Sequence, residues 1–233
     1  MRMILLILAL VLPVMAGREF VAGSSQLGVG AIEPIDPPFT VVARGLAQQN
    51  SASAILLSVD TTTNAFERVQ VNFVGAFAGD PIYLSAVSAA GAGADAVGSG
   101  FATNTWHHIA AVVASSTSRV LWVDGVARVT NTTSIAVNGL NQVALGARKS
   151  TSYGTFWTGG IAEVAIWSAA LTDAEIASLA SGAAPFMIRP ASLVFYAPLT
   201  GRETSTEWNL YGSAVSLTNA PTASALHPRI YRP

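Results

Sequence analysis

Short runs of β-branched and aromatic residues recur along this chain of 233 residues, and stretches of Gly, Pro, Asn, Asp and Ser separate them. Runs of this length and composition are typical of β-strands. The runs that we expect to form strands cover residues 39–46, 54–59, 69–77, 82–87, 142–148 and 156–167. The Ala-, Gly- and Ser-rich stretch 88–100 is expected to be a loop.

The run 69–77 alternates apolar and polar side chains. Val69, Val71 and Phe73 point to one face of the expected strand. Gln70 and Asn72 point to the other face. This alternation is typical of a strand that has one face in a core and one face in solvent.

The segment 104–125 sets two histidines beside a tryptophan and ends in Asp124-Gly125. An Asp-Gly pair between apolar runs favours a type I′ hairpin turn, because both central residues of that turn have positive φ. His107 and His108 are adjacent on the strand expected before the hairpin, so their side chains point to opposite faces. A zinc site would need further ligands. We therefore interpret both histidines as ordinary sheet residues.

A single short helix is expected after the last of these strands. Thr172 and Glu175 have the spacing of a capping box, in which each side chain hydrogen-bonds to the backbone amide of the other residue. Gly182 is expected to end the helix. One helix among so many strands predicts an all-β fold, an antiparallel two-sheet jelly-roll sandwich.

The composition excludes several classes of site. The chain has no cysteine, which rules out disulfides, thiolate zinc sites and cysteine nucleophiles. Its net charge is -1 and it has no run of Lys or Arg, so we expect no binding of nucleic acid. Only 11% of the residues are charged, which favours a surface that meets other protein, in a homo-oligomer or a lattice.

Residues 1–16 form an apolar segment with one positive side chain, Arg2, and they end in Val14-Met15-Ala16. The segment is too short to cross a bilayer, so we expect no stable membrane span. Two interpretations stay open for it. It is either a secretory signal peptide with a small-residue cleavage site, or a hydrophobic arm that docks on a neighbouring subunit.

Four blocks resemble, in order and spacing, the laminin G-like branch of the concanavalin A-like jelly rolls. They read WHHIA at 106–110, LWVDG at 121–125, GGIAEVAIW at 159–167 and LTDAEI at 171–176. The resemblance implies a jelly-roll domain over residues 17–182, preceded by the segment 1–16 and followed by a Pro-rich C-terminal extension, 183–233. The stretch from Pro185 on more loosely resembles C-terminal extensions of such domains in tailed-phage structural proteins.

The sequence lacks the arrangements that hydrolases need. Glycosidases of this superfamily carry paired carboxylates on one strand face, whereas the matching strand here has Glu163 followed by Ala165 and Ser168. There is no G-x-S-x-G motif for a serine nucleophile, and the third histidine, His227, lies in the tail. We therefore expect a protein without enzymatic activity and without a cofactor.

Laminin G-like folds can bind glycans, often with calcium at the rim of the sandwich. The side chains that we consider as calcium ligands are four aspartates expected in turns, namely Asp60, Asp80, Asp95 and Asp124. They are scattered along the chain, whereas calcium needs six to eight oxygens together. We therefore favour the interpretation that they are turn formers.

Sugar binding would need exposed aromatic rings. The most suggestive cluster lies in a Ser-, Thr- and Gly-rich stretch and consists of Tyr153, Phe156 and Trp157. These three residues are the candidate glycan contacts. Core packing is the favoured alternative for Trp157.

Two hypotheses about function remain. The first is a non-enzymatic structural protein of a phage virion, such as a capsid decoration protein, whose ends lie along the capsid or along neighbouring subunits. It predicts that deleting residues 1–16 or 185–233 leaves the sandwich folded but prevents incorporation. The second is a secreted bacterial glycan-binding module with a cleaved signal peptide.

Overall fold

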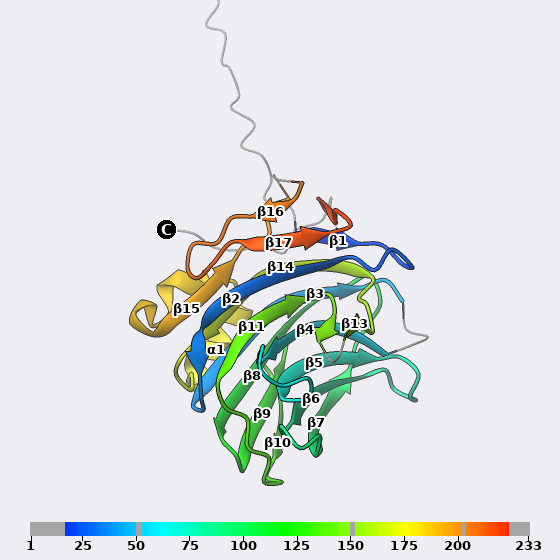
Figure 1. Cartoon of the computed structure of the whole chain (residues 1–233). Helices are drawn as coiled ribbons and strands as arrows, with labels where there is room; N and C mark the ends of the chain where they lie inside the picture. Colours follow the sequence, from blue (N-terminus) through cyan, green and yellow to red (C-terminus); the bar gives the residue numbers. More distant parts are fainter. Residues whose placement is uncertain (1–16, 50–52, 150–151, 202–203, 224–233) are drawn as a thin grey trace, which may run out of the picture.

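The computed structural model describes residues 17–49, 53–149, 152–201 and 204–223, so the apolar segment 1–16 and His227 lie outside the described residues. Two antiparallel sheets of eight strands face each other (Figure 1). The expected all-β sandwich with one short α-helix is confirmed. None of the helices in the described ranges is long and apolar enough to cross a membrane.

We call the two sheets sheet A and sheet B. Sheet A contains, in order, β10 (Ala127–Asn131), β9 (Ser118–Val123), β8 (Trp106–Ser115), β3 (Phe39–Ala47), β14 (Gly159–Trp167), β1 (Arg18–Phe20) and β18 (Thr222–Ala223), and β15 (Leu193–Ala197) also pairs with β14. Sheet B contains, in order, β16 (Thr206–Glu207), β17 (Val215–Thr218), β2 (Leu27–Ile35), β11 (Leu140–Leu145), β4 (Ser53–Asp60), β5 (Arg68–Val74), β6 (Pro81–Val87) and β7 (Gly93–Gly100). A short hairpin is formed by β12 (Arg148–Lys149) and β13 (Tyr153–Gly154).

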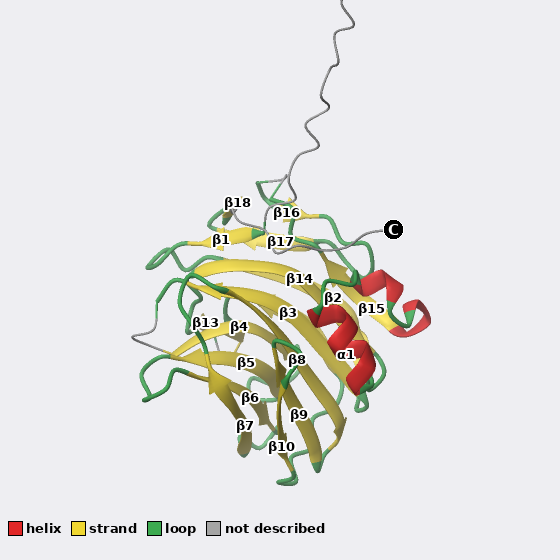
Figure 2. Ribbon diagram, turned by 180° about the vertical axis from the view of Figure 1, so that it is seen from behind, coloured by secondary structure: helices red, strands yellow, loops and turns green. Residues whose placement is uncertain are grey.

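The main core lies between the two sheets, and a second apolar cluster lies on the other side of sheet A. Three helical segments cover that side, namely α1 (Asp173–Ala180), η1 (Pro185–Met187) and η2 (Pro190–Ser192). Figure 2 shows α1 in front of the strands of sheet A. Ile176 and Leu179 are the buried residues of α1, as a helix with one apolar face requires. The outer face of sheet A is therefore covered.

The local motifs of the sequence form as expected. Asp124 and Gly125 have φ values of 52° and 72°, which fits the turn expected between β9 and β10. Thr172 and Glu175 make both hydrogen bonds of the capping box. Gly182, with φ of 106°, follows the C-cap of the helix.

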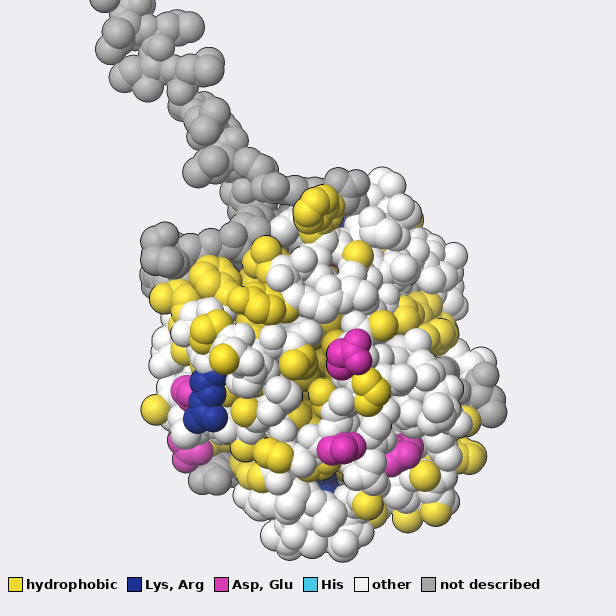
Figure 3. All heavy atoms as spheres, turned by 60° about the vertical axis from the view of Figure 1, so that its left-hand side comes forward, with side chains coloured by type: hydrophobic (Ala, Val, Ile, Leu, Met, Phe, Trp, Pro, Cys, Tyr) yellow, Lys and Arg dark blue, Asp and Glu magenta, His cyan; other side chains and the backbone are white. Residues whose placement is uncertain are grey.

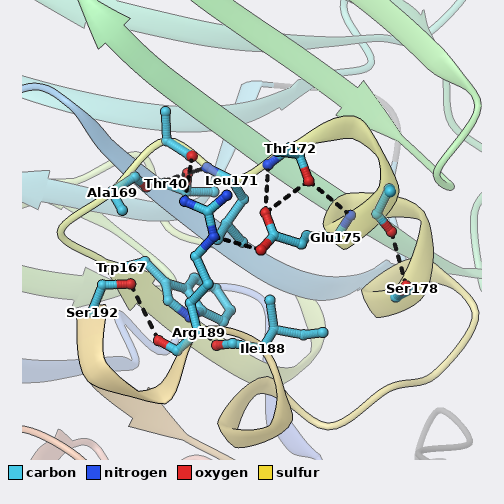
Figure 4. A network of polar contacts seen from close by, with 12 residues as sticks. Thr40, Trp167, Ala169, Leu171, Thr172, Glu175, Ser178, Ile188, Arg189 and Ser192 are labelled. Carbon is cyan, nitrogen blue, oxygen red and sulfur yellow. Dashed lines mark hydrogen bonds and ion pairs between the residues drawn. The ribbon is translucent and has the colours of Figure 1, made fainter.

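A network of polar contacts attaches α1 to sheet A (Figure 4). The Thr40 hydroxyl donates to the Ala169 carbonyl at 2.8 Å and accepts from the Leu171 amide at 2.9 Å. Trp167 Nε1 donates to the Ile188 carbonyl at 2.7 Å. These contacts fix the loops on both sides of the helix, so the helical cover is built into the fold.

The stretch 88–100 is not entirely a loop, because residues 93–100 form β7 at the edge of sheet B. The prediction of a loop is wrong because backbone pairing with β6 does not depend on the size of the side chains. Ala96 lies in the core, and a Cβ atom added to Gly98 would lie 2.9 Å from Leu121. Small residues are therefore what this close approach of β7 to sheet A needs.

The segment after residue 182 contributes strands to both sheets. β15 and β18 belong to sheet A, whereas β16 and β17 belong to sheet B. Phe195, Leu199 and Val215 are fully buried in the main core. The described part of this segment is therefore integral to the sandwich.

Candidate functional site

The outer face of sheet B is the side that points away from sheet A. In antiparallel strands, residues directly opposite each other point to the same face, so the register sorts side chains into rows across the sheet. Two rows point into the core and are apolar. They consist of Val143, Val59, Val69, Ala86 and Ala94, and of Leu145, Leu57, Val71, Leu84 and Ala96.

The alternate rows point outward, and most of their members are polar. Row 1 contains Gln142, Asp60, Arg68 and Val87, row 2 contains Ala144, Ser58, Gln70, Ser85 and Asp95, and row 3 contains Ile55, Asn72, Tyr83 and Val97. The outer face of sheet B thus presents hydrogen-bonding side chains on five neighbouring strands. This is the candidate site.

The centre of this face is held by hydrogen bonds between its own side chains. Ser58 Oγ donates to Asp60 Oδ2 at 2.7 Å. Arg68 Nε donates to Gln70 Oε1 at 2.8 Å, and Arg68 Nη1 donates to the Phe66 carbonyl at 2.7 Å. All four side chains that make these contacts are buried. They are therefore held in fixed positions, which is a property of preorganised binding sites.

The β12–β13 hairpin lies over the row 1 end of the outer face. Ser58 Oγ shares the same proton, more weakly, with the carbonyl of Ala147, which directly precedes β12, at 3.3 Å. Tyr153 OH donates to Gln142 Oε1 at 3.1 Å. Burial, and then the negative charge of Asp60, raise the pKa of Tyr153. In Figure 1, β13 is seen in front of sheet B.

The row 3 end of the face is open and carries aromatic rings. Tyr83 and Asn72 are half-buried, and Phe77, in the turn before β6, is 60% exposed. The ring centroids of Phe77 and Tyr83 are 6.4 Å apart. Asn72 Oδ1 has no hydrogen-bond partner within the described part of the chain. Amide groups and aromatic rings together are what sugars need, because sugars offer both hydroxyls and apolar C–H faces.

The structure separates the three candidate glycan contacts of the sequence. Tyr153 lies on the outer face of sheet B through its bond to Gln142. Phe156 is half-buried in the segment between β13 and β14. Trp157 is 1% exposed and contacts Phe73 at a centroid distance of 4.9 Å, so it belongs to the core, as the favoured alternative for this residue states. The sequence pattern alone does not point to Asn72, Tyr83 or Phe77 as glycan contacts.

The two adjacent histidines lie on opposite faces of β8, as the alternation predicts. His107 points to the main core, where its ring is 6.3 Å from that of Phe73, and its Nδ1 is 2.8 Å from Asp124 Oδ2. His108 points to the other side of sheet A. The hydrogen bond with Asp124 raises the pKa of His107, although burial opposes it.

His108 is 2% exposed, and neither ring nitrogen has a hydrogen-bond partner within the described ranges. Together with Arg44 and Glu163 it lines a small cavity of about 10 Å³ under α1, which is room for a single water molecule. Burial, reinforced by the positive charge of Arg44, lowers the pKa of His108 to about 3. The ring is therefore neutral at physiological pH.

We expect His108→Leu to flatten the dependence of stability on pH. Because the folded pKa of His108 is below its ordinary value of 6.5, its neutral ring favours the folded state above pH 6.5, and that advantage is lost as pH falls from 6.5 towards 3. Between pH 7 and pH 4.5 the free energy of unfolding of the native chain should fall by about 2–3 kcal/mol more than that of the variant.

Urea unfolding at both pH values measures this difference. His107→Gln is the matched control, since the raised pKa of His107 acts with the opposite sign and its removal should steepen the loss of stability on acidification. An equal pH dependence in the native chain and in His108→Leu would contradict the assignment of a buried neutral ring.

Glu163 does not lie in an open cleft. It is 2% exposed, and its Oε2 accepts a hydrogen bond from Tyr196 OH at 2.5 Å. It has φ of 52° in the irregular part of β14, where the register with β3 shifts. Its carboxylate lines the small cavity beneath α1 rather than any surface groove.

The four aspartates considered for calcium do not converge. Asp60 and Asp95 lie in strands rather than in turns, and Asp124 is bonded to His107 and to the backbone amide of His108. Asp80, with φ of 45°, lies between β5 and β6. Among the residues that the structure describes, no three His, Asp or Glu side chains are grouped so that they could hold a metal ion.

Comparisons with known proteins agree with this architecture. The pentraxin of Limulus polyphemus, a heptameric SAP-like pentraxin, superposes with a TM-score of 0.59 at 13% identity, over 90% of this chain and 94% of that chain. The CBM40 domain of Ruminococcus gnavus IT-sialidase, bound to α2,3 sialyllactose, gives 0.54 at 13% identity, over 71% of this chain and 96% of its own. Domain 4 of AbnA, an extracellular arabinanase of Geobacillus stearothermophilus, in complex with arabinotriose, gives 0.50 at 18% identity, over 64% and 71%.

At such low identity these likenesses show the fold alone. No curated protein matches the chain in sequence. A laminin G family model, described as the concanavalin A-like lectin/glucanases superfamily, matches residues 38–177, which is more than half of the chain. The chain therefore belongs to the concanavalin A-like lectin/glucanases superfamily.

Proposed function

We propose that the chain is a secreted, non-catalytic glycan-binding module that holds an oligosaccharide on the outer face of sheet B. The observation that carries this proposal is the set of outward rows, in which polar side chains and the rings of Tyr83 and Phe77 share one face. Tyr83 and Phe77 would stack on the C–H faces of a sugar, and Asn72 would bind its hydroxyls.

The superfamily and the similar structures support this proposal in preference to a virion protein. The CBM40 domain and domain 4 of AbnA are described with a bound oligosaccharide. The family match and the similar structures give no support to a role in a phage particle. Secretion makes residues 1–16 a cleaved signal peptide, so mass spectrometry of the secreted chain should find Gly17 at its N-terminus.

Tyr83→Ala tests the site directly. On a glycan array and by titration calorimetry, we expect it to weaken binding of the best glycan about five- to thirtyfold, since a stacked ring in a sugar site contributes on the order of 1–2 kcal/mol. Phe77→Ala should weaken binding in the same direction.

Trp208→Ala is the matched control. Trp208 is 78% exposed, and it follows β16, at the opposite edge of sheet B from β6 and β7. This variant should bind as the native chain does. Loss of binding in Trp208→Ala and not in Tyr83→Ala would show that the site does not lie on the outer face of sheet B. If the native chain binds no glycan on the array, the proposal of glycan binding is contradicted.

A further inference from the structure

The row 1 end of the outer face carries two arginines. Arg68 is 7% exposed and lies opposite Asp60 in the register of β4 and β5. Arg148 is the first residue of β12 and directly follows Ala147, whose carbonyl accepts from Ser58 next to this row. Arg148 is half-buried. The hairpin thus places a second arginine close enough to Arg68 for its positive charge to act on that guanidinium.

Neither guanidinium has used all its donors within the described part of the chain. Arg68 donates from Nε and Nη1, and its Nη2 makes no hydrogen bond to a described residue. Arg148 makes no hydrogen bond or ion pair with any described residue. The planar fork of an arginine binds a carboxylate through two parallel hydrogen bonds. Free donors on these two arginines therefore favour an anionic partner.

The electrostatics of the pair point in the same direction. Burial, and then the nearby positive charge of Arg148, lower the pKa of Arg68, and Asp60 only partly opposes this. Two arginines and one aspartate leave an excess of positive charge at the row 1 end of the outer face, where Arg68 is buried and Arg148 is half-buried. A bound anion would relieve the repulsion between the two guanidiniums, and it would be worth more there than on an open surface.

We infer that the glycan is acidic, and that a carboxylate of one of its sugars binds Arg148 and Arg68. This inference rests on the proposed function, because it concerns the ligand of the same face. Arg68 and Asn72 are four residues apart on β5, which is about 13 Å along a strand. The ligand is therefore an oligosaccharide that reaches from its carboxylate at row 1 to a sugar stacked on Tyr83 at row 3.

An array with matched pairs tests the inference. Sialylated, glucuronate and galacturonate oligosaccharides are printed beside the same glycans with their carboxyl groups reduced to alcohols. The native chain should bind the best acidic glycan about tenfold or more above its reduced form, as expected for a charge-assisted hydrogen bond. This preference should shrink at high salt.

Arg148→Gln should remove the preference for the acid and keep the weaker binding of the reduced form. Arg189→Gln is the control of equal charge change, because Arg189 lies on the helical side of sheet A and pairs with Glu175. Equal binding of acid and reduced forms by the native chain, or an acid preference that survives in Arg148→Gln, would overturn the inference and leave glycan binding standing. Binding of neither form would overturn both.

Discussion

We expect a chain that ends at Gly182 to be unfolded. β15 pairs with β14 along four residue pairs. Without β15, the C-terminal half of β14 becomes an unpaired edge. The truncation also removes Phe195, Leu199 and Val215 from the main core and Tyr196 from the cluster under α1. Each large apolar side chain lost from a core costs about 2–5 kcal/mol, so losing all four costs about 8–20 kcal/mol, which is as large as the whole stability of about 5–15 kcal/mol.

The fit of Phe195 shows why this segment is irreplaceable. A Cβ atom built on Gly30 of β2 would lie 2.8 Å from the Phe195 ring, so the glycine makes room for this ring between the two sheets. Phe195→Ala should therefore lower the free energy of unfolding by about 3–5 kcal/mol. Val194→Ala, at the half-buried neighbouring position, should cost clearly less.

Circular dichroism, hydrogen exchange and urea unfolding of the purified chains measure these effects. The control truncation ends at Ala223, the last described residue, and it should unfold cooperatively with sheet signals like those of the full chain. A folded, cooperative chain ending at Gly182 would contradict this account. It would restore the expectation, drawn from the sequence, that residues 185–233 can be removed from an intact sandwich.

The parts of the fold that the sequence reveals are those governed by local rules. The turn at Asp124-Gly125 and the capping box at Thr172 are fixed by hydrogen bonds within a few residues. The strand character of β7 comes instead from pairing with β6. Such long-range pairing leaves little trace in a local pattern, which is why β7 is expected to be a loop.

For the same reason, the sequence predicts only part of the candidate site. The alternation of β5 identifies Gln70 and Asn72 as polar positions on one face, which is a local property. Their placement beside Ser85 and Tyr83 depends on the register of β5 with β6, which a local pattern does not reveal. The cluster of aromatic residues in the sequence makes Trp157 a candidate glycan contact, yet its ring packs against Phe73 in the core.

Arg18→Ala should destabilise the chain by about 3–5 kcal/mol, because it leaves a buried carboxylate without its cation. Arg18 Nε is 2.5 Å from Glu207 Oε1, and these side chains are 2% and 1% exposed. Arg18 Nη1 also donates to the Pro221 carbonyl at 2.5 Å, and Glu207 Oε1 accepts from the Gly201 amide at 2.6 Å. The pair thus joins β1 of sheet A to β16 of sheet B, next to β18.

The comparison with Arg189→Ala isolates the effect of burial. Arg189 Nε is also 2.5 Å from a carboxylate oxygen, that of Glu175, but these side chains are 39% and 22% exposed (Figure 4). Figure 3 shows how few charged side chains lie on the face of the molecule that it presents, among many hydrophobic ones. An exposed ion pair is worth about 0–1 kcal/mol because water solvates both charges once they separate.

The double variant Arg18→Met with Glu207→Leu distinguishes the contribution of the ion pair from the cost of leaving one buried charge unpaired. Replacing both charges by apolar side chains removes the cost of an unpaired buried ion, so it should cost less than Arg18→Ala alone. Urea unfolding at neutral pH measures all three chains. Equal losses in Arg18→Ala and Arg189→Ala would show that the shared distance, and not the burial around it, determines what an ion pair contributes to this sandwich.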